Sequence, residues 1–140
     1  MKKSYLIFPL LLFFGHFSRA QTFSSEERRK EVEDILNIVI NSSPFDSVYS
    51  QKRVYILANE LLMENSPLAL KRNKCKAKFL NEEGIKKVKQ YIVLGDFTLD
   101  WNNPIAVRVQ LSISTNKTLN IRLEKENGNW IIRNHMILED

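Results

Sequence analysis

The sequence predicts an α+β domain in which an N-terminal amphipathic helix packs on a curved antiparallel β-sheet that ends in a four-stranded meander. Apolar residues recur at helical spacing soon after position 24, and residues 91–138 alternate between apolar and polar. Asn127-Gly128 interrupts the last alternating run, and Asn-Gly is the pair preferred in two-residue hairpin turns because both positions need φ > 0. A helix and a sheet with one apolar face each are expected to cover each other.

The first twenty residues have the pattern of a secretory signal peptide. Two lysines precede an apolar stretch from Tyr5 to Phe14, and the segment ends in Ser18-Arg19-Ala20. The apolar stretch is shorter than the about 20 residues that a spanning helix needs, and no later stretch is longer. We therefore expect cleavage near Ala20/Gln21, no membrane span in the mature chain, and one domain over residues 21–140. Its expected location is a periplasm or the medium outside the cell.

Cleavage also changes the charge balance of the working protein. Of the 21 lysines and arginines, Lys2, Lys3 and Arg19 lie in the expected signal peptide, which leaves 18 basic against 16 acidic residues and a net charge of +2. Non-specific nucleic-acid binding depends on a strong positive field. The balance therefore disfavours a nucleic-acid partner.

The counts of cysteine and histidine restrict the chemistry. Cys75 is the single cysteine, so no disulfide can form within the chain, and the mature chain contains one histidine, His135. A Cys–His dyad would have to join these two, and a His-rich zinc site cannot be built. Cys75 alternates with lysines far from His135 in sequence, which favours an inert thiol. We expect no metal, no cofactor and no catalytic residue.

The N-terminal helix has a start signal and an apolar stripe. Ser24 is followed three residues later by Glu27, the spacing of a capping box. The helix is expected to end near residues 41–44. The residues at helical spacing are Val32, Ile35, Leu36 and Val39.

The segment Phe45–Leu62 is open to two interpretations. Val54–Leu57 favours a buried strand starting near Arg53, because β-branched and aromatic residues lie together. Ala58–Met63 suits a helix, so a helix remains the alternative there. Ser66-Pro67 then breaks the chain.

A lysine-rich segment extends from Lys71 to Lys89. Its interpretation is a lysine-protected edge strand followed by a short helix capped by Asn81. The alternative is a basic surface that docks an anionic polymer or lipid headgroups. The residues of this candidate surface are Lys74, Lys76 and Lys78 on one strand face, and Lys86 and Lys87 after the cap.

The Asn127-Gly128 turn predicts a register for the meander. Leu123 should face Ile132, and Arg122 should face Arg133. Leu119 should then face Met136, and Asn120 should face His135. A turn at residues 115–117 pairs Val109 with Leu123, and Phe97 is expected opposite Val109. Tyr91, Val93, Gly95, Leu99 and Trp101 share the parity of Phe97 and are expected on the same face. This register places Asp96, Gln110, Arg122 and Arg133 side by side on the polar face, with Arg108, Glu124, Asn120 and His135 one step away.

Two arginines directly opposite each other are unfavourable unless something offsets them. Asp96 and Glu124 on the same face, solvent, or a bound carboxylate or phosphate would do so. We therefore take Arg122, Arg133, Asp96, Gln110 and His135 as candidate ligand-binding residues.

The C-terminal run Leu123–Ile132, with its Gly-x-Trp-x-Ile ending after a charged hairpin, resembles the end of an α+β domain of the nuclear-transport-factor-like or cystatin-like superfamily, as many small secreted bacterial proteins do. The resemblance implies a sheet that wraps a cavity. Enzymes of that superfamily use Asp/His or Tyr/Asp pairs inside the cone, and no such motif matches this chain residue by residue. The likeness supports the fold and leaves activity open.

Three function hypotheses follow from these observations. The first is a non-enzymatic binding module for an anionic small molecule or an envelope protein. The second is a small cavity enzyme with His135 and Asp96 as acid–base groups. The third is an assembly subunit, for example a homodimer joined through an exposed strand edge.

Overall fold

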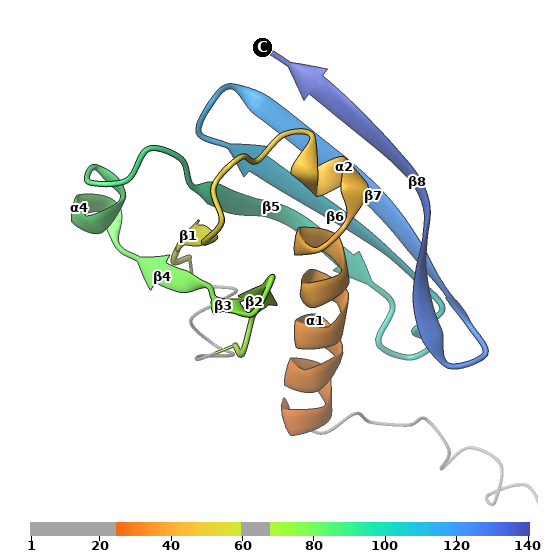
Figure 1. Ribbon diagram of the computed structural model, residues 1–140. Coiled ribbons are helices and arrows are strands. Elements are labelled where there is room, and N and C mark those ends of the chain that lie inside the picture. The colour runs from red at the N-terminus through yellow and green to blue at the C-terminus, as the bar shows by residue number, and fades with distance from the viewer. Residues whose placement is uncertain (1–24, 60–67) are drawn as a thin grey trace, which may run out of the picture.

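The computed structural model describes residues 25–59 and 68–140 and has an α+β architecture (Figure 1). Helix α1 (Ser25–Ile40) packs on one face of a six-stranded mixed sheet whose strand order is β4-β1-β5-β6-β7-β8. The predicted fold class is thereby confirmed. The expected signal peptide, the Ser24 cap and most of the alternative helix at 58–63 lie outside the described residues.

The described elements also include two short helices and a separate two-stranded hairpin. In chain order they are α2 (Ser43–Asp46), β1 (Tyr55–Leu57), β2 (Lys71–Arg72), β3 (Cys75–Lys76), β4 (Lys78–Leu80), α4 (Glu82–Ile85), β5 (Ile92–Leu99), β6 (Ala106–Ile113), β7 (Lys117–Glu126) and β8 (Asn129–Glu139). β1 confirms the strand expected near Arg53. Among the described helices, none is long and apolar enough to cross a membrane.

The apolar stripe of α1 forms the centre of the core. Ile35 and Val39 are fully buried, and the helix ends at Ile40, as its sequence predicts. Their neighbours in the core come from the inner face of the sheet and include Val107, Val109, Leu111, Leu119, Ile121 and Leu123. The strict alternation of β6 is thus confirmed, and it leaves the polar side chains of the meander on the outer face.

A charged contact ties the start of α1 to the last hairpin. One carboxylate oxygen of Glu31 accepts hydrogen bonds from Lys125 Nζ and Trp130 Nε1, each at 2.6 Å. The Lys125 ammonium also lies 5.2 Å from the centre of the Trp130 ring, within cation–π range. Because Trp130 is itself buried, this contact fixes how the β7–β8 hairpin closes over the helix.

Two pairs of neighbouring strands in the sheet are parallel, whereas the sequence predicted an antiparallel sheet. β1 pairs in parallel with both β4 and β5, and β5 to β8 form the expected antiparallel meander. β4 is an edge strand of only three residues, and Lys78 on it is exposed. This agrees with the interpretation of a lysine-protected edge.

The turn between β6 and β7 begins one residue earlier than expected. Residues 114–116 form it, and Asn116 takes the left-handed φ of 62° that such a turn requires. As a result Val109 faces Ile121 and not Leu123. The shift moves every partner by two positions, so the same residues stay buried.

A β-bulge in β5 corrects a second expectation. Leu94 pairs with Leu111 and Phe97 with Val109, so both Gly95 and Asp96 lie opposite Gln110. The extra residue exchanges the two faces of the strand. Upstream of the bulge, the buried side chains are therefore those of Ile92 and Leu94. The prediction that Tyr91, Val93 and Gly95 share the apolar face with Phe97 and Leu99 is therefore wrong. The predicted pairing of Phe97 with Val109 is confirmed.

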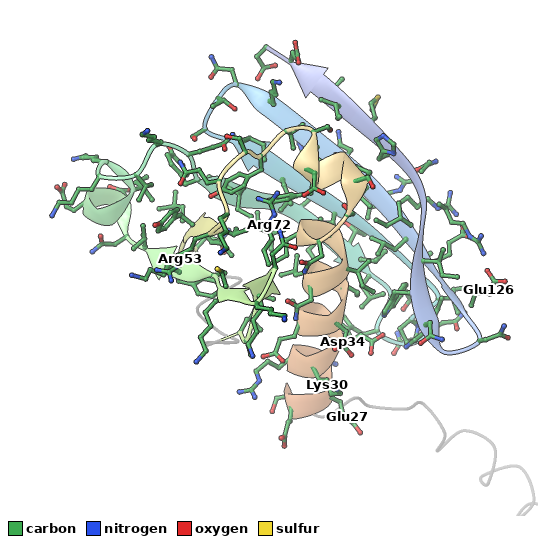
Figure 2. The ribbon with its side chains drawn as sticks, viewed as in Figure 1. Glu27, Lys30, Asp34, Arg53, Arg72 and Glu126 are labelled. Carbon is green, nitrogen blue, oxygen red and sulfur yellow. The ribbon has the colours of Figure 1, made fainter. Side chains whose placement is uncertain are left out.

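Arg72 is a buried cation that fastens the β2–β3 hairpin to the segment after α1. Figure 2 shows it inside the fold, beside the C-terminal end of the helix. Its guanidinium donates to the backbone carbonyls of Gln51 and Tyr49 and to Asp46 Oδ1, the last at 2.7 Å. It also lies 5.1 Å from the centre of the Phe45 ring. The side chain therefore joins the β2–β3 hairpin to the segment 45–51.

Removing this guanidinium should destabilise the protein strongly. Arg72→Ala takes the donor away from two carbonyls and is expected to lower the free energy of unfolding by about 2–3 kcal/mol. Asp46→Ala removes a carboxylate that is 57% exposed and leaves the guanidinium with both carbonyls. Its expected effect is therefore smaller than that of Arg72→Ala, although the buried cation loses its ion pair. Urea denaturation of both variants measures the difference, and equal losses would contradict the assigned role of the carbonyls.

Tyr49 predicts a pH dependence of stability. Burial raises the pKa of its hydroxyl above the ordinary 10.0, although the hydrogen bond from Tyr55 opposes this. Between 10.0 and the raised value the unfolded chain loses the proton and the folded chain keeps it, so stability is complete below pH 10.0 and falls as pH rises above it. The difference in unfolding free energy between wild type and Tyr49→Phe should shrink from pH 9 to pH 11. A constant difference would refute the argument.

Candidate functional site: a polar groove on the outer sheet face

The outer face of the meander carries two polar rows that run across β5 to β8. We name the first the arginine row and the second the amide row. The strand pairings define the arginine row as Thr98, Arg108, Arg122 and Asn134. The amide row is Asp96, Gln110, Asn120 and Met136, with Asp96 in the β5 bulge.

The two rows line a groove with a volume of about 610 Å³. Its remaining lining residues are Val109, Ile121 and His135. A strongly twisted sheet is saddle-shaped, so its outer face is also concave along one diagonal. The volume lies in the range of small-molecule sites, about 300–1,000 Å³. The groove can therefore hold a small polar ligand.

Arg108 and Arg122 face each other directly across β6 and β7 inside this groove. Arg122 forms an ion pair with Glu124 at 2.8 Å, whereas Arg108 has no ion pair with any residue that the structure describes. Like charges directly opposite each other on a sheet are destabilising. Arg108 therefore has no carboxylate partner among the described residues, and the neighbouring Arg122 shares Glu124 with Arg133.

Arg133 lies elsewhere than the sequence predicted. A bulge in β8 inserts it between Ile132, which pairs with Leu123, and Asn134, which pairs with Arg122. Its guanidinium donates to Glu126 and, at 3.3 Å, to Glu124, and the hydrogen bond that it donates to Glu126 is the main cause that raises the pKa of Arg133. The predicted Arg122–Arg133 pair is wrong, and Arg133 does not line the groove.

The same bulge moves His135. The residue was expected opposite Asn120, but it pairs with Ile121, whose side chain belongs to the core face, and Met136 pairs with Asn120. His135 and Asp96 both border the groove, yet β6 and β7 lie between their strands. Three strand spacings of about 4.8 Å separate them by roughly 14 Å, too far for a direct proton transfer.

A small cavity lies between α1 and the inner face of the sheet. It has a volume of about 10 Å³ and is lined by apolar side chains such as Leu36 and Leu111. A cavity needs about 10–15 Å³ to hold one water molecule. In the described part of the fold, this cavity is therefore core packing and not a ligand site.

Cys75 and His135 are far apart in the fold. Cys75 lies in β3, opposite Arg72 in the separate hairpin, and its thiol is free and half-buried. His135 lies on β8 at the far edge of the main sheet (Figure 1). Within residues 25–59 and 68–140, no group of three or more His, Cys, Asp or Glu side chains could hold a metal ion.

The five lysines of the candidate basic surface are all exposed. Lys74 occupies the β2–β3 turn with φ 69°, and Lys76 faces Lys71 across that hairpin. Lys86 forms an ion pair with Glu83 at 2.7 Å. The expectation of one strand with Lys74, Lys76 and Lys78 on a single face is wrong, because Lys76 lies on β3 of the hairpin and Lys78 on β4 of the main sheet. The alternation of exposure itself is present, since Cys75, Ala77 and Phe79 are half-buried between the exposed lysines. Asn81 caps α4 as expected, by accepting from the Gly84 amide.

Sequence reasoning found part of the groove. Asp96, Gln110, Arg122 and His135 border it, whereas Thr98, Asn120, Asn134 and Met136 were not among the candidates and Arg108 was placed one step away. The alternation of β6 did assign Arg108 and Gln110 to one face. The cross-strand partners could not follow from it, because they depend on the turn and the two bulges.

Comparison of the chain with protein-family models, with curated proteins and with solved structures finds no match. The groove must therefore be interpreted from its own geometry.

Proposed function

We propose that the protein is a non-enzymatic binding module that holds a small anionic molecule in the outer groove. The observation that carries the proposal is the Arg108–Arg122 pair, two opposed cations in a groove of ligand size. A carboxylate or phosphate between two guanidiniums accepts charge-assisted hydrogen bonds and removes their repulsion. The ligand then supplies the countercharge that Arg108 lacks among the described residues.

The amide row defines what else the ligand should carry. Gln110 and Asn120 face each other next to the arginines and offer both donors and acceptors. Asp96, at the β5 end of this row, accepts hydrogen bonds or a positive charge. The chemistry favours a small anion that also bears hydroxyl or amino groups, such as a sugar acid or an amino acid. Bulky apolar ligands are disfavoured, because polar side chains form most of the two rows.

The proposed location is a periplasm or the extracellular medium, and it rests on the signal-like pattern of residues 1–20. Kinship with the nuclear-transport-factor-like and cystatin-like superfamily belongs to the same proposal. The helix packed on a C-terminal meander supports it, as does the Gly-x-Trp-x-Ile ending of the last hairpin.

Thermal-shift measurements with phosphate, citrate, glucuronate and glutamate test the groove. An anion at about 100 times its dissociation constant should stabilise the fold by about 2.7 kcal/mol. Arg108→Ala/Arg122→Ala should remove the shift while the protein still folds. Arg133→Ala is the control, because it removes one arginine from the same sheet outside the groove, and it should keep the shift. If no anion stabilises the wild type, or if Arg133→Ala alone removes the effect, the proposal fails.

Glu124→Gln provides a variant that should gain binding. The carboxylate of Glu124 is the only ion-pair partner of Arg122 among the described residues, so its neutralisation frees that guanidinium for a ligand. The dissociation constant of the best anion from the screen should fall severalfold, as measured by isothermal titration calorimetry. Weaker binding would show that the anion does not compete for Arg122.

The intact mass of the protein recovered from a secreting bacterial host tests the proposed location. Cleavage near Ala20 should leave Gln21 as the new N-terminal residue. Recovery of the uncleaved chain from the cytoplasm would contradict it.

A further inference from the structure

The two edges of the main sheet differ in length and chemistry. The β4 edge is three residues long and exposes Lys78. The β8 edge is eleven residues long and contains neither lysine nor proline. Of the four exposed large hydrophobic side chains among the described residues, three lie on β8: Ile131, Met136 and Leu138. The β4 edge is thus short and carries an exposed lysine, whereas the β8 edge is long and exposes apolar side chains.

The second half of β8, from Asn134 to Glu139, lacks the usual protection against pairing with a further strand. Such protection comes from edge lysines, prolines, bulges or a short strand. The bulge of β8 is at Arg133, and from Asn134 to Glu139 its pairing with β7 continues without interruption. Arg133 is engaged by Glu124 and Glu126 on its own sheet. No described strand pairs with the outer side of β8.

We infer that β8 pairs with β8 of a second copy of this chain in antiparallel orientation across a two-fold axis. Charge favours this partner and this direction: Arg133 directly precedes the uninterrupted half of the strand, and Asp140 follows its end beside Glu139, which also pairs with Lys117 at 3.3 Å. Antiparallel self-pairing brings opposite charges together, whereas parallel pairing aligns like charges. Such an interface is isologous, which is the commonest arrangement in soluble oligomers.

The two-fold axis is expected close to Met136, which lies in the middle of the uninterrupted half of the strand. Met136 and Leu138 of the two copies then cover each other, which removes exposed apolar surface from water. Asn134 and Met136 also line the groove, so dimerisation brings two grooves together along one continuous outer face. The inference concerns assembly and does not depend on the proposed anion.

Sedimentation velocity over a wide concentration range tests the inference. The wild-type protein should shift toward twice its monomer mass as its concentration rises. Met136→Lys/Leu138→Lys installs the missing edge lysines at exposed positions and should sediment as a folded monomer, with its fold checked by circular dichroism. Ile105→Lys is the matched control, because Ile105 is 57% exposed but lies outside β8, and it should still dimerise. A wild-type protein that stays monomeric at millimolar concentration overturns the inference.

Cysteine crosslinking locates the interface independently of those variants. In a Cys75→Ser background, at least one of Asn134→Cys, Met136→Cys and Leu138→Cys should form a disulfide-linked dimer, because residues facing each other across antiparallel strands are close enough to be bridged. Ile105→Cys in the same background should not. A wild-type dimer that none of the β8 cysteines crosslinks, or that persists in Met136→Lys/Leu138→Lys, uses another surface and refutes the inference.

Discussion

The packing of α1 against the inner face of the meander is the contact on which the rest of the structure depends. Ile35 and Val39 are fully buried among side chains such as Leu119 and Leu123. Once the helix occupies this face, the alternation of the strands sends every second side chain to the other side. Arg108 and Arg122 are exposed there as a result. The core therefore determines which face remains available for binding.

The sequence predicted which residues of β6 and β7 face the core, because that assignment depends only on the alternation of odd and even positions along a strand. A turn displaced by one residue moved the partner of Val109 from Leu123 to Ile121, two positions away, and both are apolar. Burial was unchanged, and the predicted layers were correct. The start of the final hairpin was also correct, since Asn127-Gly128 sets Leu123 opposite Ile132. Local turn chemistry and hydrophobic pattern were sufficient for these features.

The partners within the polar rows could not be predicted, because they depend on the shifted β6–β7 turn and on the two bulges. In β8 the bulge removes Arg133 from the row and places Asn134 opposite Arg122. The apolar pairs Ile131-Ile132 and Ile137-Leu138 are compatible with either register, so the pattern gives no sign of an extra residue. The repulsion expected between two arginines is present, but between Arg108 and Arg122. Glu124, which was expected to offset an arginine pair, contacts Arg122 and Arg133.

Nuclear magnetic resonance of the arginine side chains during a citrate titration tests the account most directly. The account predicts that the Nε–H signals of Arg108 and Arg122 shift together and saturate at one concentration, along with the side-chain amides of Gln110 and Asn120. The signal of Arg133 should change little, because Glu126 and Glu124 already hold it. Saturating shifts at Lys74, Lys76 and Lys78, with none in the groove, would contradict the assignment of the site to the outer face of the sheet.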